Sequence, residues 1–360
     1  MISQRLVLRF ALTHKRRVGG RSFRCCALVE GIVMLRTKPV LYFVVPCYNE
    51  EAVLPETSGR LIEKLKKLKE QGKIDAKSRI LFVNDGSADR TWELISELHM
   101  NHETVSGISL TRNRGHQNAL LAGLLYAKDH ADAVISMDAD LQDDIEAADE
   151  MLERYAEGCD IVYGVRNNRD TDSWFKRWSA RTFYRLMSRL GVELVSDSAD
   201  FRLMSRRALN GLAEFKEVNL FLRGIVPMIG LKSAKVYYKR GKRFAGESKY
   251  PLMKMISFSV EGITSLSIQP IRLITNAGIL IFFASLVLLV WGIVQKMRGL
   301  TVQGWSSLIV SVWAIGGLIL LSIGVIGEYI GKIYLESKKR PRFLIDEILD
   351  ADGDAETQSL

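Results

Sequence analysis

The sequence predicts an α/β domain with a mostly parallel sheet, followed by two transmembrane helices. From residue 40 onward, short apolar runs alternate with amphipathic stretches of helical period, a pattern typical of parallel strands covered by helices on both faces. Near the C-terminus, residues 273–295 and 299–327 contain no charged side chain. Each run is longer than the ~20 residues that a helix needs to span a bilayer. We therefore expect membrane helices at about 273–295 and 304–327.

The apolar runs give the expected strands, and the amphipathic stretches give the expected helices. We expect strands at 41–45, 80–83, 107–110, 133–136 and 160–163, and helices at 57–70, 90–100, 116–130 and 145–157. In an open sheet of this kind, ligands bind beyond the carboxyl ends of the strands. Three of these ends carry acidic or turn-forming clusters, namely PCYNE at 46–50, NDGSADR at 84–90 and MDADLQDD at 137–144. These clusters are the first candidates for a functional site.

Several classes of protein are excluded by motifs that the sequence lacks. No GxGxxG and no GxxxxGK[ST] follows a strand, which argues against a glycine-fingerprint dinucleotide fold and against a P-loop NTPase. The four cysteines show neither a CxxC nor the spacing of a disulfide framework or zinc site. We therefore expect the protein to reside in a reducing compartment and to contain no structural zinc.

The net charge of +9 is concentrated at the N-terminus. Residues 1–33 carry seven Lys and Arg against one Glu, so only +3 is left for the rest of the chain, and nucleic acid is not indicated as a partner. The stretch is Arg-rich like an organellar presequence but lacks the apolar core of a secretory signal. Because Met34 stands directly before the first strand, we expect residues 1–33 to be a disordered extension upstream of the natural start.

An acidic motif at the end of the fourth predicted strand indicates a metal site. Asp138 and Asp140 are two residues apart, so both carboxylates can point at one divalent cation, with Gln142 adding a neutral oxygen. A cation held there would turn an acidic site into one that binds phosphate. Aspartate pairs are also common in turns, so the pair alone is a weak signal. Asp143 and Asp144 are expected in the first turn of the next helix, where negative charge suits the helix dipole.

Taken together and in this order, the three clusters resemble those of family-2 glycosyltransferases, which have the GT-A nucleotide-sugar fold. The similarity extends to SWFKRWSARTFYRL at 173–186, ADFRLM at 199–204, FLRG at 221–224 and GESKYPL at 246–252. Within the family, the set looks like the bacterial polyprenyl-phosphate glycosyltransferases of the bactoprenol glucosyltransferase type, which are related to dolichol-phosphate mannose synthase. The resemblance covers about residues 40–335 and implies a GT-A catalytic domain at 34–250.

The resemblance implies roles for the residues that bind the sugar donor. The residues that would line the nucleoside pocket are Pro46, Tyr48, Asn49, Glu50 and Asp138. Asp85 would accept a hydrogen bond from the base, since a uracil imide N–H needs an acceptor, although NDGS is also an ordinary Asx-turn sequence. The residues that would hold Mg²⁺ or Mn²⁺ are Asp138, Asp140 and Gln142, and the cation would stabilise the charge of the departing diphosphate.

The resemblance also implies residues on the acceptor side. Asp200 would be the catalytic carboxylate that faces the acceptor, with Asp197 as the alternative. A lipid phosphate is largely ionised at neutral pH, so Asp200 would orient the acceptor or stabilise the sugar cation more than it would remove a proton. Attack from the face opposite the leaving group would invert the configuration at C1.

A phosphate acceptor needs cations, and the planar guanidinium of arginine matches phosphate geometry. By motif position, the implied acceptor-phosphate residues are Arg166, Arg181, Arg202, Arg240, Ser248 and Lys249. A solvated basic face beside an anionic membrane is the alternative for part of this set. Arg112 and Arg114 are candidate nucleotide contacts. We assign no chemistry to His116, because a histidine at a helix start after a glycine caps or packs as readily as it catalyses.

Charges around the apolar runs predict the membrane topology. Basic residues flank the pair of runs on its outer sides, whereas the short linker carries only Lys296 and Arg298. The positive-inside rule therefore predicts an inner-membrane protein with its catalytic domain and both termini in the cytoplasm. We expect an interfacial amphipathic helix at 251–271, a transmembrane hairpin within 272–331 and a cytoplasmic tail at 332–360. Gly327 and Gly331 form a small-xxx-small step that would suit a homo-oligomer.

These observations predict an inverting, metal-dependent enzyme that transfers one hexose, in first place glucose, from a UDP-sugar to a polyprenyl phosphate at the cytoplasmic membrane face. The nearest alternative is a dolichol-phosphate mannose synthase-like enzyme that uses a GDP-sugar. A processive polysaccharide synthase is disfavoured because no QxxRW occurs. A non-catalytic membrane scaffold or flippase is disfavoured because all four key carboxylates, Asp85, Asp138, Asp140 and Asp200, are present.

Overall fold

The computed structural model describes residues 38–167, 198–218, 221–239, 241, 264–265, 267–298 and 304–350. Several expectations concern residues outside this set. They are the extension at 1–33, most of the interfacial helix at 251–271, the alternative carboxylate Asp197, and the phosphate candidates Arg181, Arg240, Ser248 and Lys249.

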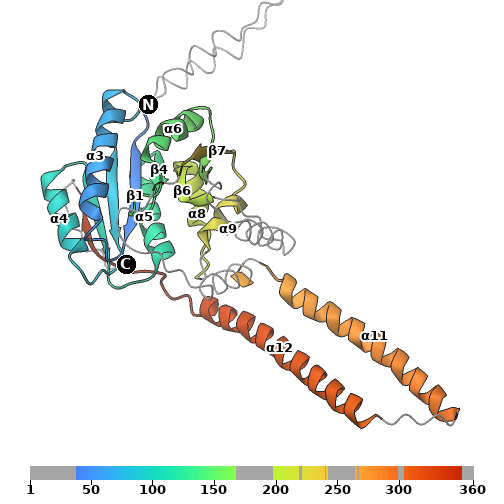
Figure 1. The fold of residues 1–360 in the computed structure, drawn as a ribbon. Coiled ribbons are helices and arrows are strands. Elements are labelled where there is room, and N and C mark those ends of the chain that lie inside the picture. Colours follow the sequence, from blue (N-terminus) through green and yellow to red (C-terminus); the bar gives the residue numbers. More distant parts are fainter. Residues whose placement is uncertain are drawn as a thin grey trace, which may run out of the picture. The chain divides into compact units, whose positions relative to one another are not determined.

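Eight strands of the described chain form one sheet with the order β7-β5-β6-β4-β1-β2-β3-β8 (Figure 1). Their bounds are β1 Leu41–Cys47, β2 Arg79–Asn84, β3 Val105–Leu110, β4 Ala133–Ser136, β5 Ile161–Arg166, β6 Ser198–Ser205, β7 Ser233–Tyr238 and β8 Ile345–Leu349. Strands β4, β1, β2 and β3 are parallel, and β5 is parallel to β7. Strand β6 is antiparallel to both β4 and β5, and β8 is antiparallel to β3. The expected GT-A type of α/β fold, with its mostly parallel sheet, is confirmed.

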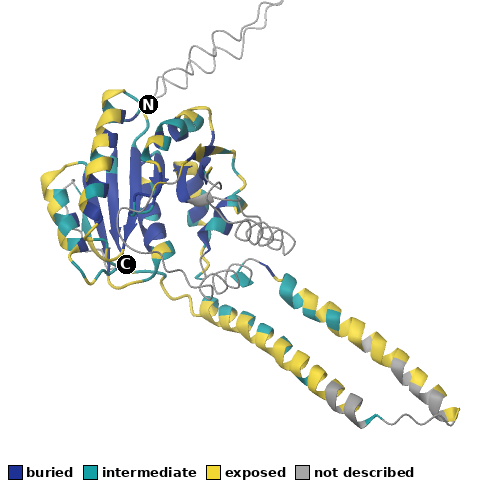
Figure 2. Ribbon diagram, viewed as in Figure 1, coloured by how far each residue is buried: buried dark blue, intermediate teal, exposed yellow. Residues whose placement is uncertain are grey.

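Helices cover both faces of the sheet because successive residues of a strand point to opposite sides. The helices are α3 Leu54–Glu70, α4 Thr91–Asn101, α5 His116–His130, η1 Ile145–Ala147, α6 Ala148–Ala156, α8 Arg206–Ala213 and α9 Leu222–Met228. In β1, Leu41 and Phe43 belong to a core shared with α3, α4 and α6, whereas Tyr42 and Val44 belong to a core shared with α5, α8 and α9. Figure 2 shows the result, a buried sheet between helices whose outer sides are exposed.

The elements expected from periodicity are present, with ends that differ by a few residues. All five expected strands and all four expected helical segments occur. The sequence pattern misses β6, β7 and β8. Strand β8 lies within residues 332–360, where we expect a tail from the sequence.

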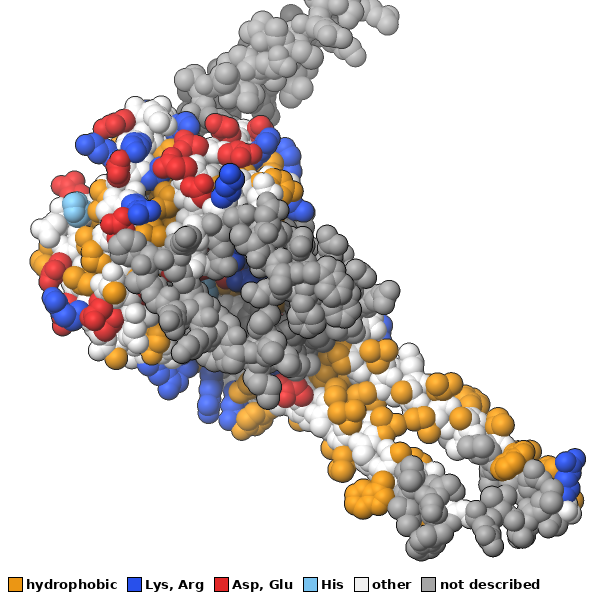
Figure 3. Space-filling view, viewed as in Figure 1, with side chains coloured by type: hydrophobic (Ala, Val, Ile, Leu, Met, Phe, Trp, Pro, Cys, Tyr) orange, Lys and Arg blue, Asp and Glu red, His pale blue; other side chains and the backbone are white. Residues whose placement is uncertain are grey.

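Two long helices, α11 (Gln269–Met297) and α12 (Trp305–Ser337), account for the apolar runs. Both are long and apolar enough to cross a membrane. Large hydrophobic side chains along them, such as Leu280, Trp291, Trp313 and Leu320, are exposed. Figure 3 shows hydrophobic side chains along both helices, while most of the charged side chains in view belong to the α/β domain. Exposed apolar surface of this extent is typical of a segment that contacts lipid or other protein.

The chain returns to the sheet after α12. Strand β8 pairs with β3, with Ile348 opposite Ile108. Two acidic side chains in this region are bonded to the domain, because Trp92 Nε1 donates to Glu347 Oε2 at 3.1 Å and the Tyr126 hydroxyl bonds to Asp350 just beyond the strand. Residues 345–350 are therefore part of the α/β domain.

One helix approaches the sheet so closely that only glycine fits. A Cβ atom on Gly123 of α5 would lie 2.5 Å from Val44 Cγ1 and 2.7 Å from Val83 Cγ2. We expect Gly123→Ala to lower the free energy of unfolding by about 1–3 kcal/mol, because the added methyl overpacks a closed core. Thermal unfolding of the detergent-solubilised protein measures this change.

Gly59→Ala is the matched control. Gly59 is exposed on α3, and a methyl group added there would meet no atom beyond its own helix turn within 4 Å, so alanine should be neutral or stabilising by up to ~1 kcal/mol. Equal melting temperatures for the two variants would contradict the close contact at Gly123.

Candidate functional site

A cavity of about 590 Å³ opens at the edge of the sheet where β1, β2 and β4 end. Seven residues singled out in the sequence border it: Pro46, Tyr48, Glu50, Asp85, Asp138, Asp140 and Asp200. They come from four segments of the chain, and the topology brings them together because parallel strands have their carboxyl ends at one edge. The cavity is therefore the candidate active site.

The loops after β1 and β2 are bonded to each other at one side of the cavity. Asn49 has a φ of 54°, in the left-handed region that asparagine tolerates, and its side chain accepts the N–H of Ala88 at 2.9 Å. The N–H of Asn49 donates to Ser87 Oγ, and that of Glu50 donates to Thr91 Oγ1. Asn49 itself does not border the cavity. Its observed contacts position the neighbouring Tyr48 and Glu50, which do.

Asp85 borders the cavity but is already hydrogen-bonded on both oxygens. Its Oδ1 accepts the N–H of Arg114 at 2.7 Å and its Oδ2 accepts the N–H of Gly115 at 2.9 Å. Burial raises the pKa of Asp85, although these two bonds act in the opposite direction. The side chain that bonds within NDGS is that of Asn84, whose Oδ1 accepts the N–H of Ser87 three residues on. Asp85 thus ties the end of β2 to the start of α5.

The loop after β4 brings Asp138 and Asp140 to the cavity, whereas Gln142 does not border it. Asp140 Oδ1 accepts the N–H of Gln142 at 3.1 Å, closing a turn in which Leu141 has a φ of 57°. Asp138 Oδ1 is buried without a hydrogen-bond partner in the described chain. Burial, with the nearby charges of Asp143, Asp200 and Asp140, raises the pKa of Asp138 to about 6.

This arrangement fits a divalent cation. A buried carboxylate oxygen without a donor is costly, and a cation would offset that cost. Within the described residues, no group of three or more His, Cys, Asp or Glu side chains is arranged to hold a metal ion. A cation beside Asp138 and Asp140 would therefore take its other ligands from a bound phosphate and water, as Mg²⁺ commonly does.

Asp143 differs from its expected place in the first turn of a helix. It is buried, it accepts a hydrogen bond from the Tyr238 hydroxyl, and Arg166 Nη2 lies 3.6 Å from its Oδ1. Arg166 also donates from Nε to the Tyr238 hydroxyl at 3.2 Å. Only Asp144 has the expected role, since it caps η1 by accepting the N–H of Glu146. Arg166 is thus engaged beside Asp143 and does not border the cavity.

Asp200 reaches the cavity because β6 runs antiparallel to β4. Ser136, the last residue of β4, lies opposite Arg202, so the first residues of β6 lie just beyond the carboxyl end of β4. There the Ser136 hydroxyl donates to the Asp200 carbonyl at 2.5 Å. The ADFRLM motif is therefore positioned by β6, an antiparallel strand that the sequence pattern does not predict.

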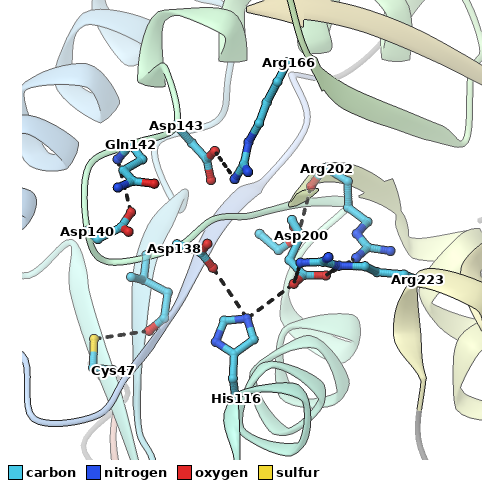
Figure 4. A network of polar contacts seen from close by, with 12 residues as sticks. Cys47, His116, Asp138, Asp140, Gln142, Asp143, Arg166, Asp200, Arg202 and Arg223 are labelled. Carbon is cyan, nitrogen blue, oxygen red and sulfur yellow. Dashed lines mark hydrogen bonds and ion pairs between the residues drawn. The ribbon is translucent and has the colours of Figure 1, made fainter. Parts of the chain in front are cut away.

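The Asp200 carboxylate is surrounded by cations (Figure 4). Arg202 Nη2 donates to its Oδ1 at 2.6 Å, and Arg223 Nη2 donates to its Oδ2 at 3.0 Å. His116 Nε2 lies 3.5 Å from Asp200 Oδ2. Burial alone would raise the pKa of Asp200, but His116, Arg223 and Arg202 hold it well below its ordinary value. Asp200 is therefore ionised at neutral pH.

His116 links the two halves of the site. Its Nε2 lies 3.5 Å from Asp138 Oδ1 as well as 3.5 Å from Asp200 Oδ2. Burial alone would lower the pKa of His116, but Asp200 and Asp138 raise it. We assign no chemistry to this residue from the sequence, since a histidine at a helix start gives no signal that two distant aspartates converge on it.

Two of the expected phosphate residues lie away from the cavity. Arg202 is buried and its side chain is only 3% exposed, while Arg166 is engaged with Asp143. The arginine that does border the cavity is Arg223, from the FLRG segment. The sequence resemblance includes the FLRG segment, but it gives its arginine no role, because nothing in the sequence shows that this side chain reaches Asp200. Arg112 and Arg114 do not border the cavity either, although Asn113 between them does.

The Asp200–Arg202 pair is expected to support folding. Removing one partner of a buried ion pair leaves the other charge poorly compensated, so Arg202→Met should lower the free energy of unfolding by about 3 kcal/mol. The estimate is at the low end of the usual range because Asp200 keeps Arg223. Thermal or denaturant unfolding measures it. Arg207→Met, at an exposed arginine paired with Asp160, should cost less than ~1 kcal/mol, and a similar loss in both variants would refute this role of Arg202.

Comparison with known proteins identifies the family of the chain. The profile of the family described as glycosyl transferase family 2 matches residues 42–212. The chain is 54% identical over 313 residues to the uncharacterized glycosyltransferase YkoT of Bacillus subtilis (strain 168), covering 87% of this chain and 93% of that one. It is 39% identical over 304 residues to the bactoprenol glucosyl transferase of Shigella phage SfV, covering 84% and 96%.

Among solved structures, the chain is similar to glucosyl-3-phosphoglycerate synthase from Mycobacterium tuberculosis, with a TM-score of 0.41, 18% identity and coverage of 69% and 83%. The sequence relatives are similar over nearly their whole length. The protein is a glycosyltransferase and belongs to glycosyl transferase family 2.

Proposed function

We propose that the protein transfers one hexose, in first place glucose, from a UDP-sugar to a polyprenyl phosphate, with inversion at C1 and with the help of a divalent cation. The observation that carries the proposal is the convergence of Asp85, Asp138, Asp140 and Asp200 on one cavity at the carboxyl edge of the sheet. The relatives named bactoprenol glucosyl transferase support both the lipid acceptor and glucose.

The nucleoside of the donor would bind beside β1 and β2. Tyr48 is half exposed at the cavity and offers a face on which a base can stack. Asp85 would have to share its oxygens between the base and the two N–H groups it already accepts, which a carboxylate with about four lone-pair sites allows. Pro46 and Glu50 would complete the wall of this half of the cavity.

The diphosphate of the donor would bind at Asp138 and Asp140. These two carboxylates would hold Mg²⁺ or Mn²⁺, which when bound supplies Lewis-acid stabilisation of the leaving phosphate. The buried Asp138 Oδ1 supports this assignment, since no hydrogen-bond donor of the described chain compensates it and a bound cation would. Gln142 does not border the cavity, and it would act through its backbone N–H, which donates to Asp140 Oδ1.

An acceptor that is already ionised suits Asp200 better than a hydroxyl acceptor does. A general base works best when its pKa is near the working pH, and the hydrogen bond from His116 with the charges of Arg223 and Arg202 keeps the pKa of Asp200 well below its ordinary value. Asp200 would therefore orient groups and balance charge, while the phosphate oxygen of the acceptor attacks C1 without first losing a proton. Attack from the side opposite the diphosphate inverts the anomeric centre.

Helices α11 and α12 would hold the domain at the membrane in which the lipid acceptor is dissolved. Their length and exposed apolar side chains fit two spans. Arg272 precedes the first, and Lys338, Lys339, Arg340 and Arg342 follow the second, which by the positive-inside rule supports a cytoplasmic catalytic domain. Nucleotide sugars would then reach the site from the cytoplasm and the acceptor from the bilayer.

A donor panel tests the proposal. Full-length protein in detergent is incubated with polyprenyl phosphate, Mn²⁺ and labelled UDP-glucose, UDP-galactose or GDP-mannose, and the lipid is extracted. We expect label in the lipid from UDP-glucose and a β-linked product by NMR. Label from GDP-mannose alone would overturn the UDP-sugar donor, and no lipid label with any donor would overturn the acceptor.

Removal of the cation or of its ligand should abolish transfer. We expect chelation by EDTA to stop product formation, added Mg²⁺ or Mn²⁺ to restore it, and Asp140→Asn to lower kcat by at least ~100-fold, because the charge on the leaving diphosphate is no longer balanced. Initial rates of lipid labelling measure this. Asp129→Asn, at an exposed aspartate paired with Lys128, is the control and should keep wild-type rates. Full activity of Asp140→Asn would sink the metal assignment.

A further inference from the structure

Arg223 holds a distinctive place among the cations of the described chain. Among the Arg and Lys residues that the structure describes, Arg223 is the one that borders the cavity. Its side chain is 40% exposed. Arg202 contacts the same carboxylate, but it is buried behind Asp200. A ligand that enters the cavity thus meets the guanidinium of Arg223 and not that of Arg202.

The orientation of the Arg223 guanidinium is fixed by Asp200. Nη2 donates to Asp200 Oδ2 at 3.0 Å and Nε approaches Oδ1 at 3.4 Å, so one edge of the planar group faces both carboxylate oxygens. A guanidinium has five N–H donors, more than one carboxylate edge accepts. Asp200 thereby holds a phosphate-matching group in a set direction.

The backbone before Arg223 is also fixed. Phe221 and Leu222 are buried, and the N–H of Leu222 donates to Gln117 Oε1 at 2.9 Å. Gln117 borders the cavity next to His116 at the start of α5. Arg223 is thus anchored on both sides, at the backbone by α5 and at the side chain by β6.

Charge divides the cavity into two unlike ends. Glu50, Asp85, Asp138 and Asp140 make one end acidic. At the other end, the single negative charge of Asp200 faces two arginines, which leaves an excess of positive charge. A phosphate monoester is repelled by the first end unless a cation is bound there, and it is attracted to the second.

We propose that Arg223 binds the phosphate of the acceptor, and that Asp200 is a positioning residue that holds the Arg223 guanidinium for this contact. The inference rests on the proposed function and deepens it, because it names the group that recognises an anionic acceptor. It replaces Arg166 and Arg202 in that role. His116, 3.5 Å from both Asp138 and Asp200, keeps the acceptor end next to the donor end.

Steady-state kinetics with two substrates test the inference. For R223Q we expect the KM for polyprenyl phosphate to rise about 10- to 100-fold, since a charge-assisted contact to phosphate is lost. The KM for the UDP-sugar, and the Kd for UDP with Mn²⁺, should stay within about twofold, because the residues proposed to hold the donor, Tyr48, Asp85, Asp138 and Asp140, are unchanged in this variant. R223K should recover part of the loss, since it keeps the charge but not the planar fork.

Controls separate the possible outcomes. R207Q, at an exposed arginine of α8 paired with Asp160, should leave both KM values unchanged. UDP binding shows that a variant is folded, and if R223Q fails to bind UDP, R223K becomes the test. If the wild type forms lipid-linked sugar, either of two results overturns the role of Arg223. One is an unchanged acceptor KM in a variant that binds UDP, and the other is a raised Kd for UDP in R223K. A wild type that forms no such lipid overturns the proposed function itself.

Discussion

Buried carboxylates that meet at one edge of the sheet are the constraint on which the site depends. Each must be compensated, because an uncompensated buried charge costs several kcal/mol. Asp85 is bonded to two backbone N–H groups, Asp143 to Tyr238 with Arg166 nearby, and Asp200 to two arginines. Asp138 Oδ1 has no hydrogen-bond donor in the described chain, as is also true of Asp143 Oδ2, and His116 Nε2 lies 3.5 Å from it. Of the three carboxylates Asp85, Asp138 and Asp200 that border the cavity, Asp138 thus accepts the fewest hydrogen bonds, at the place where a cation is proposed.

The same kind of hydrogen bonding also fixes the positions of the loops that carry the site. Loops usually carry functional groups at the cost of mobility, but here the loops after β1, β2 and β4 are bonded to one another or to helix starts. Asn49 bonds across to Ala88, and Asp85 bonds across to Arg114. Arg223 comes from the short helix α9, which Gln117 ties to α5. The geometry of the cavity is therefore set by the sheet and α5 together.

The sequence predicts the centre of the fold better than its edges. Strands β1 to β5 are recognisable because most of their residues are buried on both faces and apolar. Strand β7 alternates exposed with less exposed residues, β8 has Asp346 and Glu347 between its apolar residues, and β6 carries Asp200 and Arg202 inside a strand, so none forms an apolar run. In the site, aspartates after strands are predictable from topology. The partners of buried charges are not, because Arg166, Arg202, Arg223 and His116 differ only in contacts made by tertiary packing.

The late return of the chain to the sheet has a consequence for biosynthesis. Strand β3 is translated early, yet the strand that covers its outer edge is β8, which leaves the ribosome after both apolar helices have been made. Until then the nascent domain presents an open row of backbone N–H and C=O groups, the kind of edge that pairs with other chains. The sheet can therefore be completed only after α11 and α12 have been synthesised. In newly made molecules, this edge would be the last part of the sheet to be paired, and chaperones would have to shield it for longest.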